Sequence, residues 1–150
     1  MVTDSFAALE QQAQATWDVL ESRTRVRVGT DLNGLAAGAG QVLDALRREI
    51  ERRGLDVAVH AVGSLGQSYA EPLVDIQKPG GARIFYRNVT PDMVPQLVDD
   101  CIVGDDVRPD LALGSLGDNP PPVVTPLEEL DAWRYQVRIA TRNCGTIDPG

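Results

Sequence analysis

The stretch of residues 24–62 is the part of the sequence that most narrowly limits the fold. Its first residues, TRVRVGT, alternate polar and apolar side chains as a strand does, and a loop with several glycines, DLNGLAAGAG, follows. Apolar residues then recur at helical spacing at Val42, Leu46 and Ile50, and Gly54 stands where the C-terminal cap of a helix is expected. A second alternating segment, LDVAVHAV, comes next. Two strands joined by one helix pair in parallel through a right-handed crossover, so this stretch predicts the centre of an α/β domain.

The segments on either side of this crossover add a hairpin and further helices. LVDI and RIFYRNV flank QKPGGA, whose Pro-Gly-Gly favours a hairpin turn. The TPD segment at residues 90–92 predicts the start of another helix, and Cys101 falls on its apolar face, where a buried thiol is expected. An amphipathic helix over residues 5–21, capped by Asp4 or Ser5, is expected before the first strand. The fold class predicted is an α/β, thioredoxin-like sandwich of about four mixed strands with covering helices.

The composition changes after residue 103 and suggests a division of the chain. The segment GDNPPPVVTP predicts an extended, loosely packed arm, LEELDAW a short helix, and RYQVRIATRN is compatible with a last strand. We therefore expect an N-terminal helix over 1–23, a thioredoxin-like domain over 24–103, and an extended arm ending in a C-terminal motif over 104–150.

The charge and the cysteine count exclude several classes of function. The formal net charge is -8, which argues against a nucleic-acid partner because phosphate binding needs clustered Lys and Arg. No apolar segment has the length of a membrane span, and the N-terminus lacks the pattern of a secretory signal, so a cytoplasmic protein without membrane insertion is expected. The two cysteines form no Cys-x-x-Cys spacing, which indicates neither a disulfide framework nor a zinc site.

The residues themselves offer little for catalysis. The loop after the first strand contains only a lone Gly-x-Gly at Gly38 and Gly40 and no lysine, so it matches no nucleotide-binding motif. The only histidine, His60, is expected to be solvated or hydrogen-bonded, and no serine stands in a Gly-x-Ser-x-Gly frame. We expect that the chain is not catalytic by itself.

Three stretches together resemble one family. They are VGTDLNGLAAGA at 28–39, VGSLGQSYAEPLVDI at 62–76 and QVRIATRNCGTIDPG at 136–150. They are similar to the N-terminal thioredoxin-like [2Fe-2S] ferredoxin domain of the NADH-binding flavoprotein subunit, found in complex I relatives, NAD-linked hydrogenases, formate dehydrogenases and related oxidoreductase complexes. The resemblance implies a place in an NAD(H)-dependent oxidoreductase complex whose other subunits include a flavoprotein holding FMN, NADH and a [4Fe-4S] cluster.

The sequence departs from this family at the cluster ligands. The positions where the family has cysteine hold Asn33, Ser64 and Ser68, and the remaining, variable ligand position falls near Val28. A [2Fe-2S] cluster needs about four thiolates, sometimes with histidine in place of two. We therefore expect no cofactor and no metal in this chain, and a non-catalytic, structural or docking role.

The resemblance also marks the C-terminal motif as the expected contact with the flavoprotein. Cys144 lies inside it, and by chemistry alone a structural thiol is favoured over a reactive thiol or an intersubunit contact. Two other functions stay open: a [2Fe-2S] electron-transfer protein with unusual ligands, and an anion- or small-molecule-binding module that uses the helix N-terminus after Gly34. The residues expected to form the interaction motif are Arg142, Asn143, Cys144, Gly145, Ile147 and Asp148.

Overall fold

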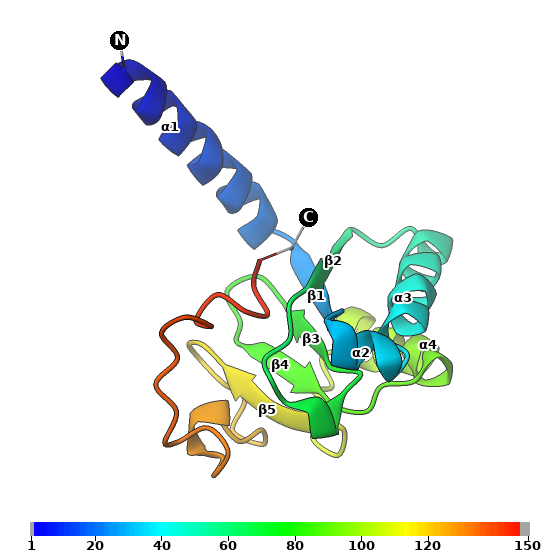
Figure 1. Cartoon of the computed structure of the whole chain (residues 1–150). Helices are drawn as coiled ribbons and strands as arrows, with labels where there is room; N and C mark the ends of the chain where they lie inside the picture. The colour runs from blue at the N-terminus through cyan, green and yellow to red at the C-terminus, as the bar shows by residue number, and fades with distance from the viewer. Residues whose placement is uncertain (1, 148–150) are drawn as a thin grey trace.

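A five-stranded mixed sheet in the order β2-β1-β3-β4-β5 forms the centre of the protein (Figure 1). The computed structural model describes residues 2–147. Strands β1 and β2 are parallel, and each of the pairs β1–β3, β3–β4 and β4–β5 is antiparallel. In chain order the elements are α1 (Val2–Glu21), β1 (Thr24–Gly29), α2 (Leu32–Ala36), α3 (Ala39–Arg53), β2 (Val57–Val62), η1 (Ser68–Ala70), β3 (Val74–Gln77), β4 (Arg83–Tyr86), η2 (Pro91–Met93), α4 (Val94–Leu97), η3 (Val98–Val103), β5 (Ala112–Leu116) and η4 (Leu127–Glu129).

The expected crossover from β1 through α3 to β2 is confirmed. The apolar stripe of α3 is buried, and Gly54 caps the helix in the left-handed conformation at φ 64°. Helices α3 and α4 lie together on one face of the sheet (Figure 1). The main core lies between these helices and the sheet, and its fully buried members include Val26, Val42, Leu46 and Val74.

Helix α1 projects away from the rest of the molecule (Figure 1). Its side chains from Ser5 to Val19 are exposed, including Phe6 and Leu9, which are 69% and 64% exposed. The amphipathic helix predicted here is present, but it begins at Val2, so neither Asp4 nor Ser5 is its N-cap.

Strand β5 corrects the expectation of a loosely packed arm after residue 103. It pairs with β4, and Val124 and Leu127 beyond it are buried at 4% and 0% exposure. A Cβ at Gly114 would lie 2.7 Å from Leu127 Cδ2 and 2.9 Å from the Thr125 oxygen. The glycine here permits close packing of the strand, and is not a sign of flexibility.

The segment RYQVRIATRN, which was compatible with a last strand, forms no strand. It consists of turns, one bend and irregular backbone. Its alternating apolar residues Val137 and Ile139 are 85% and 79% exposed. The neighbouring edge of the sheet is already occupied, because Ser115 N–H of β5 donates to the Thr125 oxygen and Ser115 forms a bridge with Pro126. The short helix predicted from LEELDAW is present only as the single 3-10 turn η4.

No helix within residues 2–147 has both the length and the apolar character needed to cross a lipid bilayer.

Candidate functional site

Two loops at one end of the β1–β2 pair hold the residues that stand at the family's cysteine positions. We call residues 30–38 and 63–72 the loop pair. Asn33, in α2, donates a hydrogen bond from Nδ2 to Oγ of Ser68, at the start of η1, at 2.9 Å. Both side chains are exposed. Two of the positions singled out from the sequence are thus brought together, as direct hydrogen-bond partners.

The third position, Ser64, bonds within its own loop. Its hydroxyl donates to Glu71 Oε1 at 3.0 Å and accepts from the Gly66 N–H at 2.9 Å. The other carboxylate oxygen of Glu71 accepts from the Leu73 N–H at 2.8 Å. Burial raises the pKa of Glu71, while the bonds from Leu73 and Ser64 act in the opposite direction. Glu71 therefore organises this loop, a role that the sequence analysis missed although the residue lies in the quoted YAEP segment.

The first loop is fixed by a close backbone approach. A Cβ at Gly34 would lie only 2.3 Å from the carbonyl oxygen of Gly29. Asp31 Oδ1 accepts from the Gly34 N–H at 2.9 Å and so caps α2. The alternative of an anion at the helix N-terminus after Gly34 stays a prediction, because the helix that begins after Gly34 is α3, and its N-cap Gly38 makes no side-chain hydrogen bond.

The fourth position, Val28, lies in β1 and not in the loop pair. It is fully buried in β1, opposite Ala61 of β2 and Val74 of β3. Its side chain belongs to the main hydrophobic core. Val28 therefore supplies packing and no polar group.

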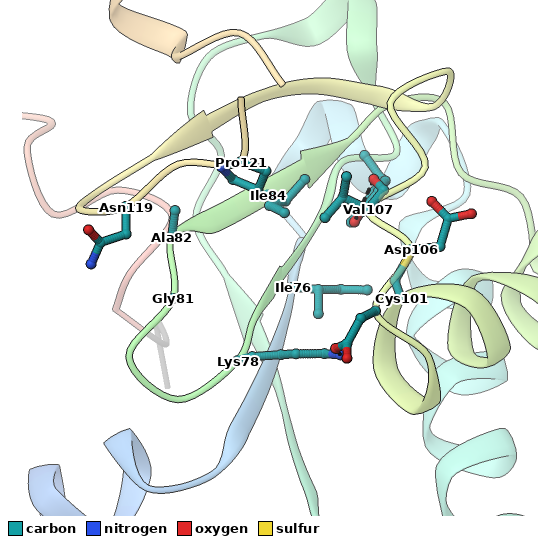
Figure 2. A pocket seen from close by; sticks show the side chains of 12 residues that line it. Ile76, Lys78, Gly81, Ala82, Ile84, Cys101, Asp106, Val107, Asn119 and Pro121 are labelled. Atoms are coloured by element: carbon teal, nitrogen blue, oxygen red, sulfur yellow. Dashed lines mark hydrogen bonds and ion pairs between the residues drawn. The ribbon is translucent and has the colours of Figure 1, made fainter. Parts of the chain in front are cut away.

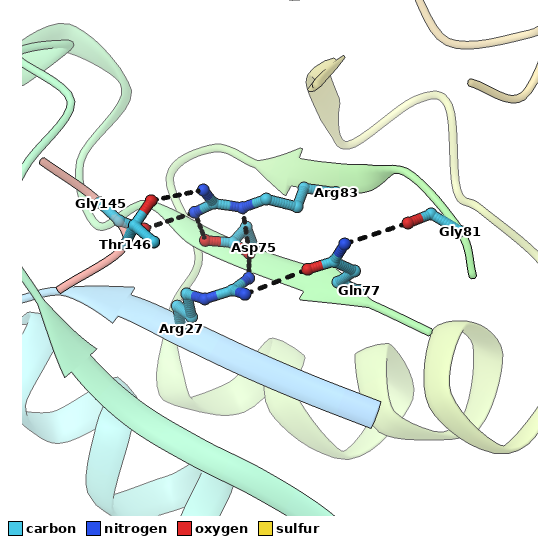
Figure 3. A network of polar contacts seen from close by, with 7 residues as sticks. All are labelled: Arg27, Asp75, Gln77, Gly81, Arg83, Gly145 and Thr146. Carbon is cyan, nitrogen blue, oxygen red and sulfur yellow. Dashed lines mark hydrogen bonds and ion pairs between the residues drawn. The ribbon is translucent and has the colours of Figure 1, made fainter. Parts of the chain in front are cut away.

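A group of buried charged side chains lies on the face of the sheet opposite the main core, which we call the open face. It connects the sheet to the C-terminal segment (Figure 3). We call Arg27, Asp75, Gln77 and Arg83 the arginine–aspartate network. Asp75 accepts from Arg27 Nη1 and Arg83 Nη2, each at 2.7 Å, and its own side chain is only 3% exposed. Burial lowers the pKa of Arg27, although the charge of Asp75 acts against this.

The network also holds the C-terminal motif. Arg83 donates to the carbonyl oxygen of Gly145 and to Oγ1 of Thr146 (Figure 3). Arg138 donates from Nη2 to the Leu65 oxygen at 3.1 Å, which links the same segment to the second loop. Gly145 has φ 77°, a conformation that favours glycine.

The members of the expected interaction motif differ in their accessibility. Gly145 is buried and Cys144 is half-buried, whereas Arg142, Asn143 and Ile147 are exposed. Asp148 lies outside the described residues.

The other cysteine, Cys101, is 5% exposed and belongs to the core, as the sequence predicted. It also lines a cavity of about 170 Å³ together with Ile76 and Ile84 (Figure 2). Burial raises the pKa of the Cys101 thiol, which keeps it protonated and unreactive. Lys78 beside the cavity pairs with Asp105 at 2.5 Å.

The side chains of the loop pair do not form a metal site of the usual kind. In the part of the chain that the structure describes, no three His, Cys, Asp or Glu side chains are grouped as metal ligands.

The arginine–aspartate network was not predicted from the sequence. The only signal for it there is the alternation of Arg25, Arg27 and Asp75 with apolar residues on their strands.

Comparisons with known proteins identify the fold. Models of known protein families give no match to the sequence, and curated protein sequences give none either. Among solved structures, the wild-type thioredoxin-like [2Fe-2S] ferredoxin from Aquifex aeolicus is similar, with a TM-score of 0.53 and 16% identity over 62% of this chain and 98% of that one.

Two further structures from the same organism agree. One thioredoxin-like [2Fe-2S] ferredoxin has a TM-score of 0.54 and 18% identity over 67% of this chain and 97% of its own. A cysteine-to-serine variant of the ferredoxin has a TM-score of 0.53 and 19% identity over 61% of this chain and 98% of its own. The chain therefore has the thioredoxin-like α/β fold of these ferredoxins, as the order of its elements predicted.

Proposed function

We propose that the chain is a non-catalytic docking domain of an NADH-oxidising, multi-subunit redox complex, built on the fold of a [2Fe-2S] electron-transfer domain but without its cluster. The observation that carries this proposal is the hydrogen bond of 2.9 Å between Asn33 and Ser68. It joins the two loops directly at positions where the similar family has cluster ligands.

The donor set of the loop pair does not fit a [2Fe-2S] cluster. Such a cluster needs about four thiolates, or two with two histidines. The loops offer the amide of Asn33 and the hydroxyls of Ser64 and Ser68, and all three groups are already hydrogen-bonded within the protein. A serine hydroxyl is less acidic and harder than a thiol, so it is a poor substitute for soft thiolate ligation.

The C-terminal segment supports docking as the retained role. Tyr135, Val137 and Ile139 are each more than three-quarters exposed, and Ile147 is 57% exposed. Arg83 holds the segment by its backbone at Gly145, and Arg138 within the segment donates to the Leu65 oxygen, so the apolar side chains are presented in a defined arrangement. Exposed apolar side chains on a fixed support are typical of a protein–protein contact. The partner we propose is the NADH- and FMN-binding flavoprotein subunit that the sequence resemblance implies.

The docking role is tested by a double variant, Val137→Asp and Ile139→Asp, co-expressed with the NADH- and FMN-binding flavoprotein subunit proposed as the partner. We expect the variant to fold and to lose co-purification with the flavoprotein. The matched control is Val103→Asp, which charges a 61% exposed valine at the end of η3. Co-purification of the double variant at the wild-type level would contradict the proposed docking surface. Deleting residues 120–150 is not a suitable test, because it removes the buried Val124, Leu127 and Trp133.

The alternative function is electron transfer by a [2Fe-2S] cluster held through unusual ligands. The similarity in fold to [2Fe-2S] ferredoxins, to the wild type as much as to a cysteine-to-serine variant, favours keeping it as the second candidate. Iron and sulfide analysis together with visible absorption, after anaerobic reconstitution, distinguishes the docking role from electron transfer. We expect a colourless protein without stoichiometric iron, and a brown protein with stoichiometric iron would establish the alternative.

A further inference from the structure

Among the residues that the structure describes, the buried guanidinium of Arg25 is only partly satisfied. The residue is 7% exposed, and its Nε has no hydrogen-bond partner within residues 2–147. Within residues 2–147 no carboxylate pairs with its guanidinium, which instead lies over the ring of Trp17 at 5.3 Å from the centroid. A buried charge is costly unless it is paired and hydrogen-bonded. A hydrogen-bond acceptor bound beside Arg25 would lower this cost.

Arg27 adds positive charge close to Arg25. It lies two residues further along β1 on the same face, where the strand register pairs it with His60 of β2. Asp75 is shared between Arg27 and Arg83, so one carboxylate serves two guanidinium groups. The charges of Arg83 and Arg25 act with burial to lower the pKa of Arg27. This face is cationic although the chain as a whole has a formal net charge of -8.

A pocket of about 210 Å³ opens onto this cationic face. Arg25, Arg27, His60 and Thr146 line it from the sheet side and the C-terminal segment, and Trp17 and Leu20 line it from the end of α1. One wall is therefore charged and the other apolar.

The geometry of Arg25 suits an oxyanion. When a guanidinium lies over an aromatic ring, its N–H groups point outward in the plane of the guanidinium. A carboxylate in that plane can accept two of these N–H groups in parallel. An inorganic anion would leave Trp17 and Leu20 without a partner, whereas an organic carboxylate with a planar apolar part contacts both walls.

We propose that this pocket between the end of α1 and the open face of the sheet binds a small organic carboxylate. Its oxygens accept hydrogen bonds from Arg25, and its apolar part packs against Trp17 and Leu20. This site does not depend on the docking role proposed above, because it lies on different residues and takes a small molecule.

The experiment is a titration of the ¹⁵N-labelled full chain with benzoate, followed by NMR. The chain has two tryptophans, so the indole N–H of Trp17 reports on the pocket and that of the buried Trp133 is an internal control. We expect saturable movement of the Trp17 signal with benzoate, a steady Trp133 signal, and weaker binding of inorganic phosphate at the same ionic strength. No movement of Trp17, or equal affinity for phosphate and benzoate, would overturn the proposal.

Variants assign the binding to the named side chains. Arg25→Gln is expected to weaken benzoate binding by about tenfold or more, because a charge-assisted bidentate contact is lost. The matched control is Arg52→Gln on α3, whose side chain is 65% exposed and which should bind benzoate as the wild type does. Leu20→Gln tests the apolar wall without touching the sheet, and should weaken benzoate but not phosphate. Wild-type benzoate affinity in either Arg25→Gln or Leu20→Gln would refute the assignment.

Discussion

The loop pair and the arginine–aspartate network hold the molecule together by different means. Between the two loops of the loop pair, a neutral hydrogen bond joins the exposed side chains of Asn33 and Ser68. In the network, the 3% exposed carboxylate of Asp75 accepts from two arginines, one of which also holds the carbonyl of Gly145. Neutral exposed bonds add little to stability, whereas breaking a buried ion pair is expensive.

The difference indicates at which positions a substitution should affect stability most. The exposed contact between Asn33 and Ser68 maintains the loop arrangement but contributes little to stability, so we expect these positions to tolerate other side chains. The network fixes the C-terminal segment on the sheet, and a change there affects both folding and the proposed docking surface.

The largest effect is expected for Asp75→Ala. Two buried guanidinium groups would lose their shared carboxylate, and the free energy of unfolding should fall by about 3–5 kcal/mol. Urea denaturation measures this, with Asp131→Ala as the control, because the Asp131–Arg134 pair is 92% and 50% exposed. A loss below about 1 kcal/mol for Asp75→Ala would place the network in the same class as a surface ion pair.

Gly34→Ala should come next and affects the loop pair through its backbone. The added Cβ would meet the Gly29 oxygen at 2.3 Å, so the backbone must shift, at a cost of about 1–3 kcal/mol. Gly63→Ala in the second loop is the matched control, because no atom lies within 4 Å of a Cβ there. Equal thermal stability of the two variants would show that the close approach at Gly34 is relaxed in solution.

Glu71→Gln tests whether a buried carboxyl group gives the loop pair a pH dependence. Because the folded-state pKa of Glu71 is raised by burial, the unfolded chain loses this proton first. The free energy of unfolding should therefore fall as the pH rises from about 4.5 towards the raised value, and this fall should be smaller in the variant. At neutral pH the variant should differ by about 1 kcal/mol or less, since the amide oxygen can accept from the Leu73 N–H while the amide nitrogen donates to the Ser64 hydroxyl oxygen. Urea titrations across this pH range measure the effect, and Glu128→Gln, at an exposed position, is the control. An unchanged slope in Glu71→Gln would assign the pH dependence to other groups.

The smallest effect is expected for Asn33→Ala. The bond to Ser68 is exposed and water replaces it, so the loss should be about 0–1 kcal/mol. A double-mutant cycle with Ser68→Ala isolates the coupling between the two side chains. A coupling energy above about 2 kcal/mol would remove the contrast between the loop pair and the network.

The sequence was sufficient for the parts of the fold that follow from local pattern. The stripe of α3, its glycine cap and the buried thiol of Cys101 are present as predicted. Strand β5 was missed because a segment rich in Gly and Pro resembles a flexible arm, while Gly114 is there to let Leu127 approach. The alternation near Val137 was compatible with a strand, but strand formation depends on a free neighbouring edge, which only the folded chain defines.

At the candidate site, single-sequence reasoning found residues but not their partners. The family resemblance selected Asn33, Ser64 and Ser68, and the structure joins Asn33 to Ser68 and Ser64 to Glu71. The shared carboxylate of Asp75 depends on the register of β1, β3 and β4, which no local pattern encodes.

The projection of α1 has a thermodynamic consequence. A helix of 20 residues spans about 30 Å, and without packing on its apolar face it is only marginally stable in water. Its coil and helical forms are therefore close in free energy, and covering Phe6 and Leu9 at about 25 cal/mol per Å² of apolar surface shifts that balance towards the helix. The helical content of α1, measured by circular dichroism, should therefore rise when a partner covers its apolar face. The free energy of ordering the helix then forms part of the binding free energy of that partner.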